Sequence, residues 1–190
     1  MAEGALAELE AKHDVAIEWS AFELRPEPAP LPDFDGAAGE RFRQHWERGV
    51  APMAAKLGVE MHFPPFKSRS RQSHEAALYA RAHDRFEPMR VALFRAFFVE
   101  NRDIGDPDVL VAIGASVGLD ADDLRAALAN GRYTDQVIEQ EQFAAQIGVT
   151  AVPTIVIGQV GVQGAQPYDV LRQVYEEAQR RATEEGAVGG

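Results

Sequence analysis

Strand-like segments occur only near the two ends of this 190-residue chain, and this distribution narrows the folds open to it. In "DVAIEWSAFEL", Val15, Ile17 and Trp19 alternate with polar or small residues, which predicts a strand over 15–24. Near the other end, "TIVIG" and "VGVQG" are short β-like runs joined by "GQ", which is typical of a tight hairpin. Because so few strands must pair with one another around one sheet, we predict an α/β fold.

The stretch between these strands, from about residue 36 to residue 147, has the pattern of successive helices. Asp106 and Asp120 stand before helical segments and are predicted N-caps, and Thr134 is a third candidate. Pro88 is expected to end or kink one helix, or to lie in the first turn of the next. A last helix follows the hairpin, and its predicted apolar face consists of Tyr168, Leu171, Val174, Tyr175 and Ala178.

Composition excludes several kinds of chemistry. The sequence contains no cysteine, which rules out disulfides, thiolate catalysis and cysteine metal sites among these residues. The five histidines show no metal-binding spacing, so we predict no metal or other cofactor. A net charge of −11 is typical of a soluble protein and argues against nucleic acid or an anionic membrane as the main partner.

The sequence shows neither a membrane span nor a secretory signal. No apolar run approaches the roughly 20 residues that a helix needs to span a bilayer. The segment "MAEGALAELEAKHD" has no basic flank and no apolar core. A cytoplasmic location is therefore the default expectation.

A proline stands at the head of the segment that most resembles a buried strand, "GVTAVPTIVIG" at 148–158. Proline removes a ladder hydrogen bond and is usually confined to strand starts, edges or bulges. One interpretation is that Pro153 is trans and simply begins the strand. The interpretation we favour is that Pro153 belongs to a binding site.

Several segments, in this order and spacing, resemble one protein family. They are "WSAFELRP", "SRSRQSHEAALYA", "LFRAFFVENRDIGDPDVLVAIGASVGLD", and "GVTAVPTIVIG" followed by "VQGAQPYDVLRQV". Together they resemble the DsbA-like branch of the thioredoxin superfamily, close to its FrnE-type and 2-hydroxychromene-2-carboxylate isomerase-type members. The resemblance implies a thioredoxin-like core with a large all-helical insertion. Residues 1–35 and 148–190 would belong to the core, and residues 36–147 to the insertion.

The resemblance also implies a site and an activity. Family members hold a cis proline before the third strand, where Pro153 stands, and this proline turns the backbone of Val152 toward an extended substrate. Thr150, Ala151 and His74 are further candidates for substrate binding, although His74 can also be interpreted as a histidine that braces the insertion. The implied activity is dithiol–disulfide exchange on protein or peptide thiols.

Two other functions remain open at this point. One is a glutathione-dependent isomerase or transferase. The segment "GAQPYD" at 164–169 counts against it, because glutathione-using relatives grip the tripeptide there with an acidic and a basic residue. The other is a peptide-binding module without catalytic activity.

The chemistry of the family lies in a segment that this sequence does not show. In family members a first strand ends in a loop with Cys-x-x-Cys, or with serine in the isomerase relatives, at the start of the first helix. Here "MAEGALAELE" resembles only the second half of that helix. We expect either that Met1 is not the natural start or that the chain is a shortened, non-redox relative. We favour the first, because the first strand would be the main partner of residues 15–24.

Overall fold

The computed structural model describes residues 2–31, 33–64 and 69–188, and these residues group into two compact units. One unit joins the first 20 residues to the segment from Phe143 onward, and the other comprises residues 21–142. Each unit has a hydrophobic core of its own, so the two units are described separately.

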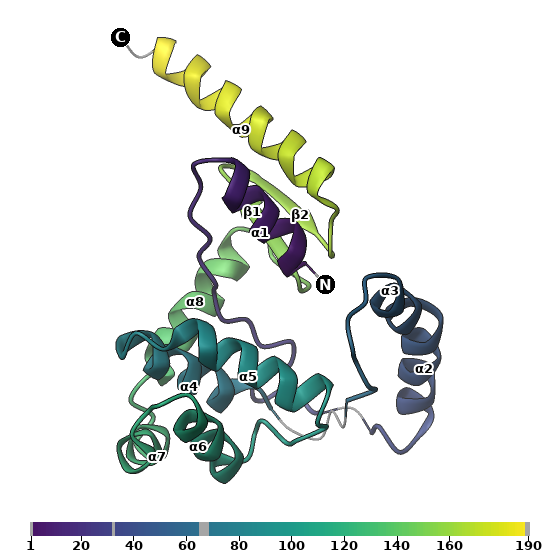
Figure 1. Cartoon of the computed structure of the whole chain (residues 1–190), viewed down its shortest axis with the longest axis vertical. Coiled ribbons are helices and arrows are strands. Elements are labelled where there is room, and N and C mark those ends of the chain that lie inside the picture. The colour runs from purple at the N-terminus through teal and green to yellow at the C-terminus, as the bar shows by residue number, and fades with distance from the viewer. Residues whose placement is uncertain (1, 32, 65–68, 189–190) are drawn as a thin grey trace. The chain divides into compact units, whose positions relative to one another are not determined.

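The first unit is built around a β-hairpin and two helices (Figure 1). The strands are antiparallel, with Ile157 opposite Val160, so that only Gly158 and Gln159 form the turn. Gly158 has φ +61°, which glycine adopts without steric cost, and the hairpin predicted from "GQ" is confirmed. The elements of this unit are α1 (Glu3–Lys12), β1 (Thr154–Ile157), β2 (Val160–Gln163) and α9 (Tyr168–Val188).

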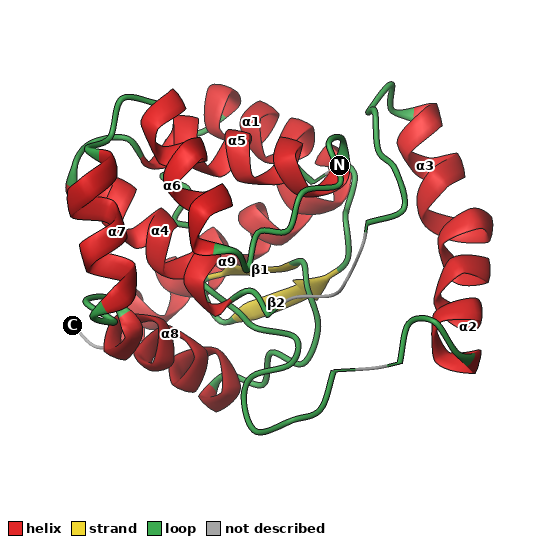
Figure 2. Ribbon diagram, turned by 90° about the horizontal axis from the view of Figure 1, so that it is seen from below, coloured by secondary structure: helices red, strands yellow, loops and turns green. Residues whose placement is uncertain are grey.

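One face of the hairpin is half-buried and the other is exposed. Figure 2 shows the two strands in yellow. Ile155, Ile157 and Val162 share the inward face, whereas Val156 on the opposite face is 46% exposed. The inward residues pack against buried leucines from α1 and α9, which are Leu6, Leu9 and Leu171. A single buried face is the usual arrangement of an antiparallel pair.

Residues 15–24 do not form the strand predicted for them. Their burial alternates as expected, because Val15, Ile17 and Trp19 pack in the core of the first unit and the residues between them are exposed. However, the ladder that the described residues form joins β1 to β2 alone, and no strand pairs with this segment. The alternation depends only on side chains, whereas a strand also needs backbone partners.

The second unit is helical. A core formed by four helices contains the fully buried side chains of Tyr79, Met89, Leu110 and Leu124. The helices are α2 (Ala37–His45), a π-helical turn (Trp46–Val50), α3 (Ala51–Lys56), α4 (Arg71–Ala82), α5 (Phe86–Phe98), α6 (Pro107–Ser116) and α7 (Ala121–Ala129). The helix α8 (Thr134–Gln146) spans the boundary between the two units.

Most of the predicted helix ends are confirmed. The carboxylates of Asp106 and Asp120 each accept a hydrogen bond from a backbone N–H in the first turn of α6 and α7. Pro88 lies in the first turn of α5. The prediction for Thr134 is wrong, because this residue is already the first of α8 and does not precede it. Its hydroxyl donates to Glu75 at 2.8 Å.

Candidate functional site

A short loop between α8 and β1 carries four of the predicted site residues, Thr150, Ala151, Val152 and Pro153. Gly148 precedes them with φ +80°, a left-handed conformation that favours glycine and ends the helix. The peptide bond between Val152 and Pro153 is cis. The four residues therefore lie together, immediately before the first strand of the hairpin.

Three hydrogen bonds fix this loop to the hairpin. The N–H of Gly164, just after β2, donates to the carbonyl oxygen of Pro153 at 2.8 Å. The hydroxyl of the first β1 residue donates to the carbonyl oxygen of Ala151 at 2.7 Å. The side-chain amide of Gln163 donates to the hydroxyl of Thr150 at 3.2 Å. These bonds hold the loop through the hydroxyl of Thr150 and through the carbonyl groups of Ala151 and Pro153.

The backbone of Val152 takes no part in these bonds. Its N–H and C=O form no hydrogen bond with any residue that the structure describes, and the residue is 46% exposed. In an antiparallel strand pair, one residue can exchange two hydrogen bonds with the residue opposite. Val152 could make this exchange with one residue of an extended peptide.

His74, the fifth predicted site residue, lies in α4 of the second unit. Burial lowers the pKa of His74, although the nearby Glu23 carboxylate and a hydrogen bond to the Phe22 backbone partly oppose this effect. The lowered pKa keeps the imidazole neutral at neutral pH. The structure groups His74 with Glu23 and Arg71, and a role in substrate binding stays a prediction.

These neighbours of His74 form an ion-pair network that the sequence did not predict. Nε of Arg71, at the start of α4, donates to the carboxylate of Glu23, and Nη2 lies 3.4 Å from Oε2 of Glu141 on α8. The backbone N–H of Glu23 donates to Oε1 of Glu141 at 3.2 Å. Burial, and next the Glu23 carboxylate, raise the pKa of Glu141. No local pattern indicates this network, because its members lie far apart in the sequence.

Beyond this network, the described residues could indicate a function through buried titratable groups, metal sites or membrane-spanning helices. Glu75 is a further buried carboxyl group on α4, and burial raises its pKa. No three histidine, cysteine, aspartate or glutamate side chains of the described part are arranged to hold a metal ion. None of the helices in that part is long and apolar enough to cross a bilayer.

Comparisons with known proteins identify what the chain resembles. A family model described as a DSBA-like thioredoxin domain matches residues 1–176. The uncharacterized protein YwbO of Bacillus subtilis is 33% identical over 171 residues, which is 88% of this chain and 84% of that protein.

Two solved structures are similar in fold. The crystal structure of a probable DsbA oxidoreductase from Streptomyces coelicolor has a TM-score of 0.76 and 30% identity, and the match covers 94% of this chain and 81% of the other. The structure of a 2-hydroxychromene-2-carboxylate isomerase has a TM-score of 0.71 and 19% identity, covering 100% of this chain and 92% of the other. At that identity the second match concerns the fold alone.

Proposed function

Because the chain belongs to the family of DsbA-like thioredoxin domains, we propose that it serves dithiol–disulfide exchange on protein substrates by docking an extended substrate segment at Thr150–Pro153. The family and the DsbA-like thioredoxin fold expected from the sequence are both confirmed by the match. The activity and the docking site are the parts that we propose here.

The unpartnered backbone of Val152 is the observation that carries the proposal. The C=O of Ala151 and that of Pro153 already accept hydrogen bonds from the hairpin, whereas the N–H and the C=O of Val152 both lack a partner among the described residues. A substrate residue opposite Val152 would accept a hydrogen bond from its N–H and donate one to its C=O. Recognition through the backbone suits a protein that acts on substrates of differing sequence.

The chain's own residues supply docking and not the redox step. Exchange begins when a thiolate attacks a disulfide sulfur and forms a mixed disulfide. None of the 190 residues is a cysteine, so the thiol and the disulfide of the exchange both come from outside these residues. What the loop contributes is the position of the substrate backbone.

An NMR titration with backbone-modified peptides tests the docking site. We expect an extended hexapeptide of alternating valine and serine to shift the amide signal of Val152 more than that of Val156, which is equally exposed on β1. N-methylation of the peptide residue opposite Val152 removes the donor that reaches its C=O, and binding should be lost. N-methylation of either neighbouring peptide residue should preserve binding, because those N–H groups point the other way.

Two results would contradict the proposal. One is a peptide that binds equally well whichever residue is N-methylated, since docking would then not use the backbone. The other is a shift of the Val152 amide with glutathione but not with the peptide, which would favour a glutathione-dependent isomerase or transferase. A Val152→Ala variant should still bind, because its backbone groups are the same.

A further inference from the structure

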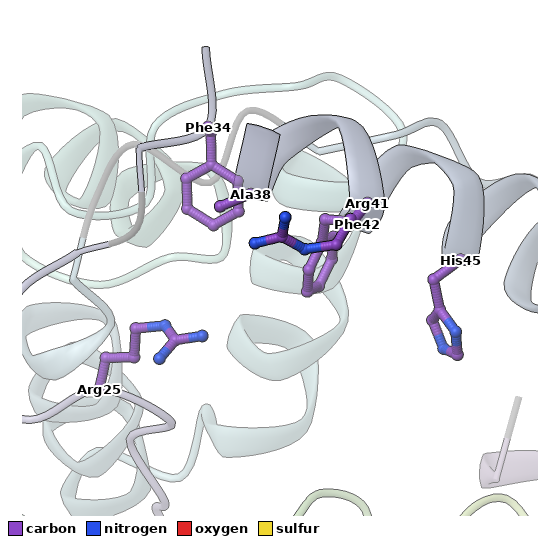
Figure 3. A pocket seen from close by; sticks show the side chains of 6 residues that line it. All are labelled: Arg25, Phe34, Ala38, Arg41, Phe42 and His45. Atoms are coloured by element: carbon purple, nitrogen blue, oxygen red, sulfur yellow. The ribbon is translucent and has the colours of Figure 1, made fainter. Parts of the chain in front are cut away.

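A basic hollow lies on the second unit, beside α2, and Figure 3 shows its lining. Its volume is about 250 Å³. The side chains of Arg25 and Arg41 extend toward the same space, from the loop before α2 and from α2 itself. The hollow is lined by Arg25, Phe34, Ala38, Arg41, Phe42 and His45, and we call it the α2 hollow.

A second hollow continues the α2 hollow along the same helix. It has a volume of about 440 Å³ and shares Arg41 and His45 with the first. Arg48 and Gln44 complete its polar lining. Residues 41, 45 and 48 follow the i, i+4, i+7 spacing of one helix face and extend over about 10 Å. The two hollows therefore form one elongated surface and not a closed pocket for a small molecule.

The arginines of this surface lack carboxylate partners. Arg25, Arg41 and Arg48 form no ion pair with any residue that the structure describes. Elsewhere in the described part most arginines are paired, as Arg90 is with Glu87 on α5. These three guanidinium groups lie along one surface of a chain whose net charge is −11. Their charge favours an anionic ligand, because guanidinium groups bind carboxylates in a bidentate geometry.

The acidic residue nearest in sequence does not neutralise Arg41. The Glu40 carboxylate accepts a hydrogen bond from Gln44 at 3.0 Å and lies 3.9 Å from Nε of Arg43. It is therefore engaged with other residues of α2. The positive charge of Arg41 remains available to a ligand.

An aromatic wall forms one side of the α2 hollow. The rings of Phe34 and Phe42 meet edge to face, with centroids 5.8 Å apart. The backbone of Phe34 lies directly on α2 at Gly39, because a Cβ there would be 1.8 Å from the Phe34 carbonyl oxygen. The glycine therefore allows the approach that places this wall beside Arg41. An aromatic side chain of a ligand could pack on the two rings.

We propose that the α2 hollow and its continuation bind an acidic peptide segment of a partner protein, with an aromatic residue on Phe34 and Phe42 and carboxylates on Arg25, Arg41 and Arg48. The elongated shape favours a peptide over a small anion, and the unpaired arginines favour an acidic one. This inference concerns the second unit only and does not depend on the docking proposed at Val152.

Fluorescence anisotropy with a dye-labelled peptide Gly-Glu-Glu-Phe-Glu-Glu-Gly tests the proposal. We expect Arg25→Gln and Arg41→Gln each to weaken binding about five- to tenfold, as the loss of one charged contact predicts. The matched control is Arg95→Gln, which removes the same charge from an exposed position on α5 and should change binding less than twofold. Binding should also weaken as salt concentration rises. Circular dichroism of each variant verifies that it is folded.

Three results would overturn the proposal. The first is equal loss of binding in all three variants, because the peptide would then sense only net charge. The second is unchanged binding of a peptide in which every glutamate is replaced by glutamine. The third is binding of phenyl phosphate that depends on Arg25 and Arg41 while the peptide does not bind, since the surface would then serve small anions.

Discussion

Arg71 donates a hydrogen bond to Glu23, whose side chain is only 2% exposed and which lies 48 residues earlier in the sequence. The same guanidinium lies 3.4 Å from Glu141, so one cation faces two carboxyl groups in the second unit. A buried carboxylate is stable as an ion only if it keeps a partner. The buried Glu23 carboxylate therefore depends on Arg71 for its stabilisation as an ion.

Arg71→Met should therefore destabilise the protein strongly. The substitution keeps much of the side-chain length but leaves Glu23 buried without its cation, and we expect the free energy of unfolding to fall by about 3 kcal/mol. Urea denaturation near neutral pH measures this loss. Arg95→Met is the control, because the Arg95–Glu100 pair is exposed and water screens it. Similar small losses in both variants would show that the buried network contributes little.

Glu75 should make stability fall as pH rises. Burial raises the pKa of Glu75 above its ordinary value of 4.5, so the folded state holds this proton to a higher pH than the unfolded chain does. The contribution of Glu75 is favourable below that ordinary value and is lost as pH rises through the raised pKa. Glu75→Gln cannot titrate, and its amide oxygen can still accept the Thr134 hydrogen bond.

The difference in unfolding free energy between the natural protein and Glu75→Gln tests this sign. Urea denaturation is measured at several pH values, from 4.5 to near neutral. As pH rises, the free energy of unfolding of the natural protein should fall relative to that of Glu75→Gln. A difference that stays constant would mean that Glu75 ionises equally readily in the folded and unfolded states, and one that moves the other way would mean that it ionises more readily when folded.

His74 should have the opposite effect on stability, which should fall as pH falls. Burial lowers the pKa of His74 below its ordinary value of 6.5, so the folded state binds fewer protons than the unfolded chain just below that pH. Stability should be lost as pH falls through 6.5 toward the lowered pKa, and a His74→Gln variant should lack this loss. An NMR titration of the His74 ring gives the midpoint directly, and a midpoint at or above 6.5 would refute the assignment.

Local sequence patterns predicted most of the fold, and the segment at 15–24 shows their limit. The carboxylates of Asp106 and Asp120 cap helices as expected, because an N-cap needs only neighbouring residues. The hairpin turn at Gly158 follows from two residues. Residues 15–24 show the predicted alternation of buried and exposed side chains without forming a strand. Whether a segment joins a sheet depends on a partner that may lie anywhere in the chain, and periodicity does not reveal that partner.

The candidate sites were predictable to different degrees. Thr150, Ala151, Val152 and Pro153 are consecutive, so a family resemblance over one segment was enough to name them. The Arg71 network was missed because its members lie far apart in the sequence. The α2 hollow was missed because only the folded loop brings Arg25 beside α2. For Arg25 and Arg41 a signal does exist, since both stand close to phenylalanines in an acidic chain, but only the folded loop shows that they face one space.

Two glycines in helices should respond in opposite ways to the same substitution. Gly114 lies in α6, where a Cβ would be 2.4 Å from Cδ2 of Leu124, and Leu124 is fully buried. Gly114→Ala gains about 1 kcal/mol of helix propensity but overpacks this contact, which costs about 1–3 kcal/mol, so we expect a net loss of stability. Gly4 in α1 has no atom within 4 Å of the same position, and Gly4→Ala should raise stability by about 0.5 kcal/mol. Thermal unfolding followed by circular dichroism compares the two variants with the natural protein. A more stable Gly114→Ala variant would mean that α6 and α7 pack less closely than the structure shows.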